Sequence, residues 1–207
     1  MEDVIQTYML PYDSDYPVVC FDEACKQLFG EVRLPRRSRR GCAQVDYEYE
    51  RRGVCNQLLL CEPLRGWRHV RVSARRTRKD YALCVRELVD VHYPEAKKIR
   101  MVQDNLNTHD GASLYEAFPP AKARRLLDKL EFHYTPKHGS WVNMAETEIR
   151  IMNGQCLDRR LDSQRVIAQE VTAWERKRNI QEARIHWTFT LAAARRKLRK
   201  LYPSIED

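Results

Sequence analysis

Three acidic residues stand where a core strand is expected to end or a helix to begin. Asp22 closes the apolar run 18–21, and Asp104 follows the apolar run 99–102. Glu146 lies near the start of a helix expected further along the chain. Carboxylates brought together from such places can bind a pair of divalent metal ions, which together activate an attacking oxygen and stabilise a leaving oxygen. These residues therefore indicate metal-dependent cleavage or joining of phosphodiesters.

The carboxylates also indicate which metal to expect. Hard oxygen ligands suit Mg²⁺, or Mn²⁺ as its substitute, and these ions keep several waters and accept phosphate oxygens. Two ions are expected because one assists each side of an in-line displacement. Without metal, three converging carboxylates repel one another, so a metal-free site should be strained or partly protonated.

Composition describes an ordinary globular protein with a basic surface. The 207 residues, 43% hydrophobic and 32% charged, predict one domain with a buried core. No stretch has the length of a membrane span and no signal peptide is evident, so we expect a cytoplasmic protein without a membrane partner. The net charge of +8 suggests a nucleic acid partner. The seven cysteines contain no Cys-x-x-Cys, which argues against a zinc site and a disulfide scaffold.

Periodicity predicts an α/β domain at residues 17–207, preceded by a linker at residues 1–16. Strands are expected at 18–22, 54–61, 67–73, 99–104 and 132–135. Helices are expected at 78–92, 114–130 with a break at Pro119-Pro120, from about 142, 163–178 and 190–201. This order predicts an antiparallel meander followed by crossover connections.

Three motifs resemble the DDE transposases of bacterial insertion sequences, in the branch related to the mariner superfamily. They lie at residues 19–23, 103–109 and 138–146, and segments 47–53 and 187–203 are similar too. The resemblance implies an RNase H-like fold, with a mixed sheet of about five strands flanked by helices and with extra C-terminal helices.

The same resemblance implies an activity and its partners. Asp22, Asp104 and Glu146 become the metal-binding catalytic residues of a Mg²⁺-dependent enzyme. It would cleave DNA at transposon ends and transfer the strand into target DNA, as a homodimer on DNA within the nucleoid. Such transposases usually carry N-terminal helix-turn-helix domains, so this chain is expected to be a catalytic fragment or the second frame of a split element. The spacing from Asp104 to Glu146 is longer than is usual, and segment 118–123 is a plausible insertion.

The choice of the third acid rests on the resemblance. Helical periodicity places Glu146 and Glu148 on opposite edges of an apolar stripe and does not distinguish between them. The resemblance selects Glu146, whose alternative role is a surface pair with Arg150. Glu23 is expected to be a neighbour of the site, because on a strand it points away from the face that carries Asp22.

Polar residues beside the acids are candidates for supporting roles. Asn105, His109, His138 and Asn143 can position a phosphate or a water near the metals. The alternatives are a helix cap for Asn143 and a turn residue for His109.

Two basic segments are candidates for contacts with DNA phosphates. The first contains Arg36, Arg37, Arg39 and Arg40, and the second contains Arg75, Arg76, Arg78 and Lys79. A solvated charged loop is the alternative for either. Trp141 can stack on a distorted base or pack in the core.

Two other functions remain open at this point. One is an RNase H-like nuclease that hydrolyses without strand transfer. The other is a non-catalytic DNA-binding fragment or regulator. Metal-dependent nicking separates an enzyme from a binder, and strand joining separates a transposase from a nuclease.

Overall fold

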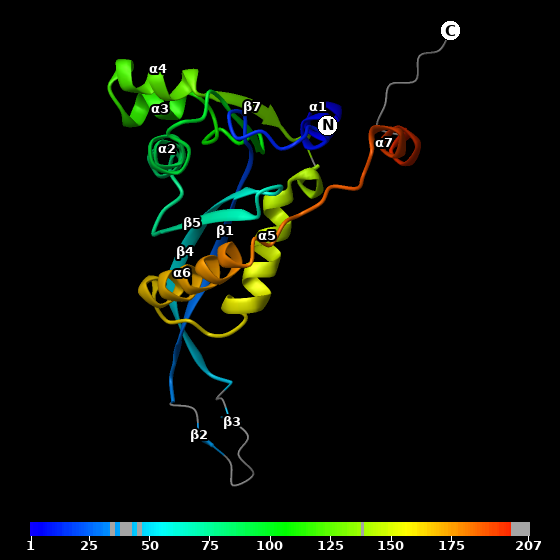
Figure 1. The fold of residues 1–207 in the computed structure, drawn as a ribbon. Coiled ribbons are helices and arrows are strands. Elements are labelled where there is room, and N and C mark those ends of the chain that lie inside the picture. The colour runs from blue at the N-terminus through cyan, green and yellow to red at the C-terminus, as the bar shows by residue number, and fades with distance from the viewer. Residues whose placement is uncertain (34–35, 38–42, 45–46, 138, 200–207) are drawn as a thin grey trace.

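One mixed sheet organises the molecule (Figure 1). The structure, a computed structural model, describes residues 1–33, 36–37, 43–44, 47–137 and 139–199. The sheet has the order β5-β4-β1-β6-β7. Its strands are β1 (Val18–Glu31), β4 (Tyr49–Glu62), β5 (Trp67–Ser73), β6 (Ile99–Gln103) and β7 (Leu130–Tyr134). Strand β4 is antiparallel to β1 and β5, whereas β1, β6 and β7 are parallel, so the expected meander with later crossovers is confirmed.

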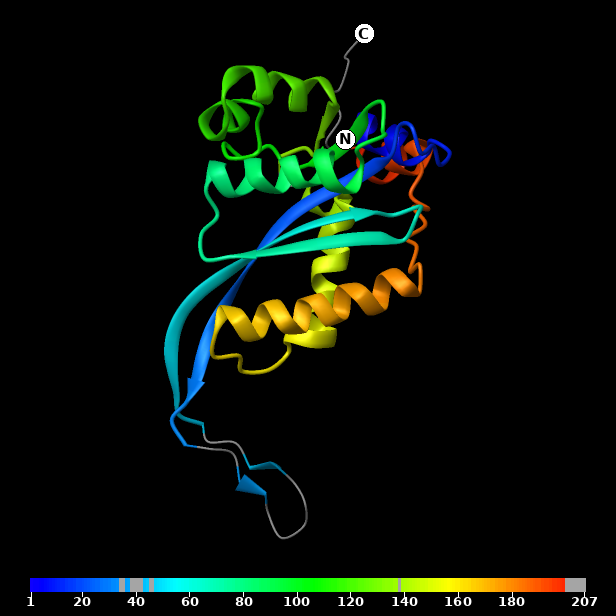
Figure 2. The same ribbon diagram turned by 60° about the vertical axis from the view of Figure 1, so that its left-hand side comes forward.

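Helices cover both faces of this sheet (Figure 2). One face carries α2 (Arg78–Glu87), the π-helix η1 (Leu88–His92), α3 (Ala112–Ala117) and α4 (Pro120–Asp128). The other carries α1 (Glu2–Tyr8), α5 (Met144–Met152), the π-helix η3 (Asn153–Leu157), α6 (Gln164–Ile180) and α7 (Leu191–Lys197). Strand β1 is buried on both faces, because Val19 and Phe21 pack on the α2 side and Cys20 packs on the α5 side.

Local sequence explains where the helices begin and end. Thr77 and Asp80 form a capping box at the start of α2, and Ser163 caps α6. The Pro119-Pro120 pair separates α3 from α4, as expected, with Pro120 in the first turn of α4, where it needs no hydrogen bond. The helix expected at 78–92 continues as a π-helix after Glu87, which periodicity does not indicate.

The N-terminal segment differs from the expected linker. Helix α1 occupies residues 2–8, and Val4 and Ile5 are fully buried in the same core as α5. Tyr8 packs against Trp187 and accepts a hydrogen bond from the backbone N–H of Met144. The short length and charged residues of this segment hid an apolar face that residues distant in sequence cover, among them Cys20, His133 and Trp187.

Strands β1 and β4 extend well beyond the sheet as an antiparallel arm (Figures 1 and 2). They are longer than the expected strands 18–22 and 54–61. The outer half of β4 is exposed and that of β1 is mostly half-buried, so neither carries the apolar pattern of a buried strand. The register shifts between Gln27 and Phe29, opposite Gly53, whose φ of 94° suits glycine. Beyond the arm, β2 (Arg36–Arg37) pairs with β3 (Ala43–Gln44).

Helix α6 covers the edge of the sheet formed by β5. Asn179 donates to the Arg68 carbonyl and accepts from the Arg68 N–H, at 2.7 and 2.9 Å. Glu175 accepts from the Val70 N–H at 2.9 Å. These side chains take the place of a neighbouring strand at Arg68 and Val70, so these backbone groups are not free to pair with another chain.

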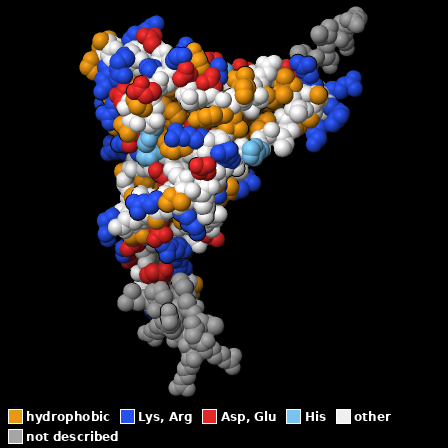
Figure 3. Space-filling model, viewed as in Figure 1, with side chains coloured by type: hydrophobic (Ala, Val, Ile, Leu, Met, Phe, Trp, Pro, Cys, Tyr) orange, Lys and Arg blue, Asp and Glu red, His pale blue; other side chains and the backbone are white. Residues whose placement is uncertain are grey.

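The surface is mixed in character. Figure 3 shows Lys and Arg side chains spread over this face, with hydrophobic side chains gathered across its upper part. Among the described residues, no helix is long and apolar enough to cross a membrane. The six described cysteines are all free, and Cys20, Cys55, Cys61 and Cys84 are buried.

Candidate active site

The three acids selected from the sequence lie on one side of the sheet. Asp22 is two residues after Cys20 on β1, so it points to the α5 face. Asp104 follows β6, the parallel neighbour of β1, and is two residues after Val102, which also faces α5. Glu146 is in the first turn of α5, which packs on that face. Strand alternation and helix packing thus direct all three carboxylates to one place.

The pKa of Asp22 reports how close these charges are. It is raised from 3.8 to about 6, chiefly by burial, although a hydrogen bond from the Glu23 backbone N–H acts in the opposite direction. The negative charges of Asp104 and Glu146 also act to raise the pKa, while His109 acts to lower it. Three carboxylates therefore repel one another in a partly desolvated site. One oxygen of Glu146, Oε2, is buried without a hydrogen-bond partner among the described residues.

Glu148 occupies a different environment. It is fully buried, and Arg68, also fully buried, donates to its Oε2 at 3.1 Å. Arg178 donates to its Oε1 at 2.7 Å. Both carboxylate oxygens are thus occupied by guanidinium groups, which leaves Glu148 no free oxygen for a metal ion. The structure points to Glu146 as the acid of α5 that is available for a ligand.

His109 lies between Asp104 and Glu23 and contacts both. Its Nδ1 contacts Asp104 Oδ1, and its Nε2 is 3.5 Å from Glu23 Oε2. The ring is fully buried between Phe21 and Tyr81, with centroid distances of 4.9 and 5.0 Å. Burial lowers its pKa, but the hydrogen bonds and charges of Asp104 and Glu23 prevail and raise it to about 9. His109 therefore carries positive charge and orients the Asp104 carboxylate.

Sequence reasoning had placed Glu23 near the site but missed its part in this chain of contacts. Its other oxygen accepts from Arg76 at 3.1 Å, so the line runs from Arg76 through Glu23 and His109 to Asp104. Strand alternation correctly turns Glu23 away from Asp22. His109 was already a candidate for a supporting role, but its contact with Glu23 has no sequence signal, because residues 104–111 contain no periodic element.

Asn143 fixes the start of the helix that carries Glu146. Its Oδ1 accepts from the Ala145 N–H at 3.1 Å, which caps α5, and its Nδ2 donates to the Phe21 carbonyl at 2.8 Å. The residue before Asp22 and the cap of α5 are thereby tied together. The expected alternative, a helix cap, is present, and the second bond additionally joins the two elements that supply acids.

A cleft of about 400 Å³ opens beside Asp104. Asn105 is exposed in its wall, and Thr135, Pro136, Lys137 and Ser140 complete the side formed by the segment after β7. His138 lies outside the described residues. Trp141 is 46% exposed and packs edge-on against Phe189 at 5.6 Å, so part of its ring stays accessible.

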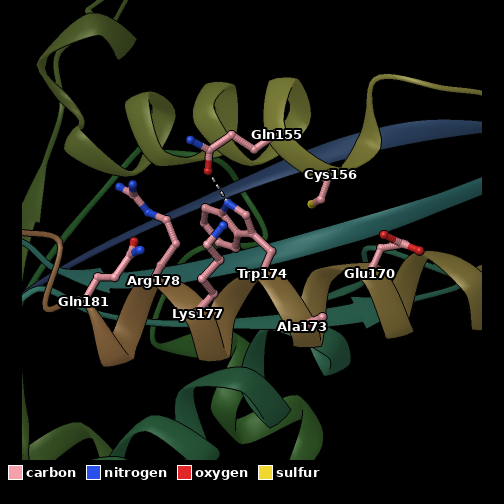
Figure 4. A pocket seen from close by; sticks show the side chains of 8 residues that line it. All are labelled: Gln155, Cys156, Glu170, Ala173, Trp174, Lys177, Arg178 and Gln181. Atoms are coloured by element: carbon pink, nitrogen blue, oxygen red, sulfur yellow. Dashed lines mark hydrogen bonds between the residues drawn. The ribbon is translucent and has the colours of Figure 1, made fainter.

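A second cleft, of about 490 Å³, lies between η3 and α6 (Figure 4). Trp174 donates to Gln155 Oε1 across it at 2.9 Å, and the Arg178 guanidinium lies over the Trp174 ring. Of the residues that line it, Glu170 is the one acid, and it pairs with Arg159 at 2.5 Å. None of Asp22, Asp104 and Glu146 lines this cleft, whereas Asp104 lines the first.

The two basic segments differ in their relation to the acids. Arg75 and Arg76 are in the loop before α2, and Arg78 and Lys79 begin that helix. Arg76 reaches the acids through Glu23, while Arg78 pairs with Glu116 at 3.7 Å. In the other segment, Arg36 and Arg37 form β2 beyond the arm. Arg39 and Arg40 lie outside the described residues.

Comparison with protein families supports the expected resemblance. The family described as DDE superfamily endonuclease matches residues 17–167, well over half of the chain. No curated protein matches the chain in sequence.

Solved structures share the fold. The Mos1 mariner paired end complex with Mn matches with a TM-score of 0.56 and 11% identity, over 87% of this chain and 56% of that chain. The Mos1 Strand Transfer Complex matches with a TM-score of 0.53 and 11% identity, over 81% of this chain and 51% of that chain. The Mos1 transposase paired-end complex with left transposon end gives 0.52 and 12%, over 81% and 51%. The chain thus spans about half the length of these transposase chains, and the expected RNase H-like fold is confirmed.

Proposed function

We propose that this chain, which belongs to the DDE superfamily endonucleases, cleaves DNA with Asp22, Asp104 and Glu146 as its catalytic residues. The observation that carries the proposal is the convergence of these three carboxylates from β1, β6 and α5 on one face of the sheet. Glu148, the rival acid on α5, is engaged by two arginines. The proposed catalytic domain is residues 17–207, with α1 packed against it.

The donor set fits divalent metal ions. Three carboxylates without enough positive charge around them, one with a buried free oxygen, are the hard ligands that Mg²⁺ and Mn²⁺ prefer. We infer that Asp22, Asp104 and Glu146 hold two Mg²⁺ ions, for which Mn²⁺ can substitute. Such ions supply charge neutralisation for the attacking and leaving oxygens of a phosphodiester.

Neighbouring residues keep the carboxylates in place. His109 donates to Asp104 and holds it in one orientation, which preserves an oxygen for the ligand on the open side. Asn143 sets the distance between β1 and the start of α5, and so between Asp22 and Glu146. Asn105, exposed in the cleft wall, is placed to contact a phosphate or a water, and the same role is proposed for His138. Catalysis then depends on positioning and charge neutralisation.

We further propose that the DNA is a transposon end and that strand transfer into target DNA follows cleavage. The fold shared with Mos1 transposase in paired-end and strand-transfer complexes supports this assignment. Those complexes also motivate the proposal of a homodimer on DNA.

Basic side chains near the acids provide the proposed contacts with the DNA backbone. The loop with Arg75 and Arg76 and the start of α2 with Arg78 and Lys79 flank the Glu23 side of the site. Exposed cations in this position neutralise phosphates without reading bases, so binding is expected to be non-specific and sensitive to salt. Arg36, Arg37, Arg39 and Arg40 are proposed as a second contact.

A nicking assay tests the proposal. With a terminal-repeat duplex and Mg²⁺, the chain should produce nicks, and Asp104→Ala should abolish them while DNA binding stays equal or becomes tighter. Removal of the carboxylate deletes a metal ligand and also a negative charge that faces phosphate. Asp158→Ala, at an exposed aspartate after η3, is the matched control and should cleave normally.

The products separate the remaining functions. Joining of the freed 3′ end to a second duplex supports a transposase, whereas nicking without joining indicates a nuclease that only hydrolyses. DNA binding without metal-dependent nicking contradicts the enzyme assignment. Equal loss of binding and cleavage in Asp104→Ala indicates misfolding, which circular dichroism detects.

A further inference from the structure

A second group of potential metal ligands lies at the edge of the sheet. His69 is on the edge strand β5, Glu87 is the last residue of α2, and His92 is the last residue of η1. One ligand atom from each lies within 4.8 Å of the others, and all three residues are partly buried. His69 pairs with Leu60 of β4, and Leu60 pairs with Phe21 of β1. The group therefore lies two strands, roughly 10 Å, away from β1, the strand that carries Asp22.

The second nitrogen of His69 is already oriented by another helix. Its Nδ1 lies 3.2 Å from Glu175 Oε1 on α6, and Glu175 Oε2 accepts from the Val70 N–H at 2.9 Å. Glu175 therefore cannot turn away without losing a backbone bond. A carboxylate that holds the far nitrogen of a histidine is the usual outer partner of a metal-binding imidazole, because it fixes the ring and its tautomer.

The atoms that face the centre of the group are left without hydrogen bonds. Nε2 of His69 and Nε2 of His92 are both buried with no hydrogen-bond partner in the described part of the chain. Nε2 of His69 is 3.5 Å from Glu87 Oε1, while the other oxygen of Glu87 accepts from Arg71 at 3.1 Å. Buried polar atoms are normally paired, so two orphaned imidazole nitrogens beside a carboxylate require an occupant.

The surroundings exclude water from one side of the group. The Trp67 ring lies 4.9 Å from the His92 ring and 6.5 Å from the His69 ring, and the two imidazoles are 4.5 Å apart. With both histidines neutral, Glu87 and Glu175 contribute two negative charges and Arg71 one positive charge. The remaining charge of −1 favours a cation.

We propose that His69, Glu87 and His92 bind a divalent transition-metal ion, with Zn²⁺ as the expected occupant. Two imidazoles and one carboxylate are ligands that zinc accepts, and a fourth position remains for water. Tetrahedral zinc ligands lie roughly 3.3 Å apart, so a small contraction of the group brings all three within reach. Zinc binding here does not use cysteine, and the proposal is independent of the function proposed for Asp22, Asp104 and Glu146.

The ion would join three elements at the sheet edge. It connects β5 directly to the end of α2 and to η1, and through Glu175 it supports the contact with α6. The π-helix η1 places His92 beside Glu87, five residues earlier, where a continued α-helix would rotate it away from that position. A metal that binds only the folded chain stabilises it by mass action.

Cobalt titration of the whole chain tests the proposal, with Mg²⁺ in large excess to compete at the acids of the active site. The expected result is a visible Co²⁺ absorption of tetrahedral type without the near-ultraviolet band of thiolate ligation. His92→Asn should weaken Co²⁺ binding by more than about a hundredfold, which exceeds the effect expected from removal of a residue that only hydrogen-bonds a ligand. Glu175→Gln should weaken it by roughly ten- to a hundredfold.

His186→Asn is the matched control, because it removes an exposed imidazole from the same chain and should leave Co²⁺ binding unchanged. Zn²⁺ at a hundredfold excess over its Kd should raise the Tm of the unmodified chain by roughly 5–10 °C, and of His92→Asn hardly at all. If His92→Asn fails to fold, Glu87→Gln gives the same test. Three results would overturn the proposal: equal Co²⁺ affinity in the unmodified chain and His92→Asn, a thiolate band, or no effect of zinc on Tm. The space between the side chains would then be occupied by a proton on His69.

Discussion

Glu146 and Glu148 belong to the same short helix and differ by two positions, yet their surroundings are opposite. Glu146 lies with two other carboxylates, and one of its oxygens is buried without a partner. Glu148 is fully buried, and each of its oxygens accepts from an arginine. About 100° of rotation per residue separates the two side chains by roughly 200°, which directs them to different neighbours.

The difference shows how charge balance distinguishes a site from a structural ion pair. Around Glu146 negative charge is in excess, which destabilises the metal-free protein and favours a cation. Around Glu148 two guanidinium groups compensate one carboxylate, and Arg68 also donates to the Gly66 and Ala183 carbonyls at 2.7 and 2.6 Å. A buried network satisfied in this way fixes the position of α5, so Glu148 supports the helix that carries Glu146.

The largest expected effect is on catalysis at Glu146. Glu146→Gln should reduce cleavage by at least about a thousandfold, because a neutral amide replaces a charged metal ligand. Its unfolding free energy should stay the same or rise slightly, since repulsion among the carboxylates decreases. Single-turnover nicking and urea denaturation measure the two quantities. A large loss of stability would place Glu146 among the structural ion pairs.

Glu148→Gln should show the reverse pattern. Loss of one partner from this buried network leaves two guanidinium groups without their counter-charge, which should lower the unfolding free energy by about 3–5 kcal/mol. Chemical denaturation of the purified variant measures the change, with Glu146→Gln as the matched comparison. A fully stable Glu148→Gln that has lost cleavage would show that the roles of the two glutamates were assigned the wrong way round.

His109→Asn should have an intermediate effect. Because His109 orients Asp104 and does not itself bind the metal, the Mg²⁺ concentration needed for half-maximal cleavage should rise by about ten- to a hundredfold. Saturating Mg²⁺ should restore most of the rate. A Mg²⁺ titration of the nicking rate provides the measurement, and a fall in rate that no metal concentration rescues would exclude this positioning role.

The smallest expected effect concerns DNA contacts. Arg75→Ala should lower the slope of log affinity against log salt by about 0.9, the value for one lost phosphate contact. Arg124→Ala is the control, because Arg124 is exposed on α4 and pairs with Asp128 at 3.0 Å. Binding titrations at several salt concentrations decide the matter. Equal slopes for Arg75→Ala and the unmodified chain would remove this loop from the DNA surface.

The parts of the fold that were predicted well are those in which local pattern and burial agree. Strand β5 matches its expected range because its residues alternate between core and surface, and the break at Pro119-Pro120 follows from proline itself. The outer halves of β1 and β4 were missed since half-buried and exposed strands carry no such pattern. Helix α1 was missed because its partners, such as Cys20, His133 and Trp187, lie outside the segment itself.

For the candidate site, the sequence by itself determined which acids end strands or begin a helix, and therefore which carboxylates could meet. Helical periodicity did not choose between Glu146 and Glu148, and the resemblance selected Glu146. Only the tertiary structure reveals that arginines from β5 and α6, distant in sequence, occupy Glu148. The same holds for His109 and Glu23, which sheet packing brings together. Local periodicity specifies the face on which a side chain lies, whereas its partners, and hence its charge balance, depend on which elements cover that face.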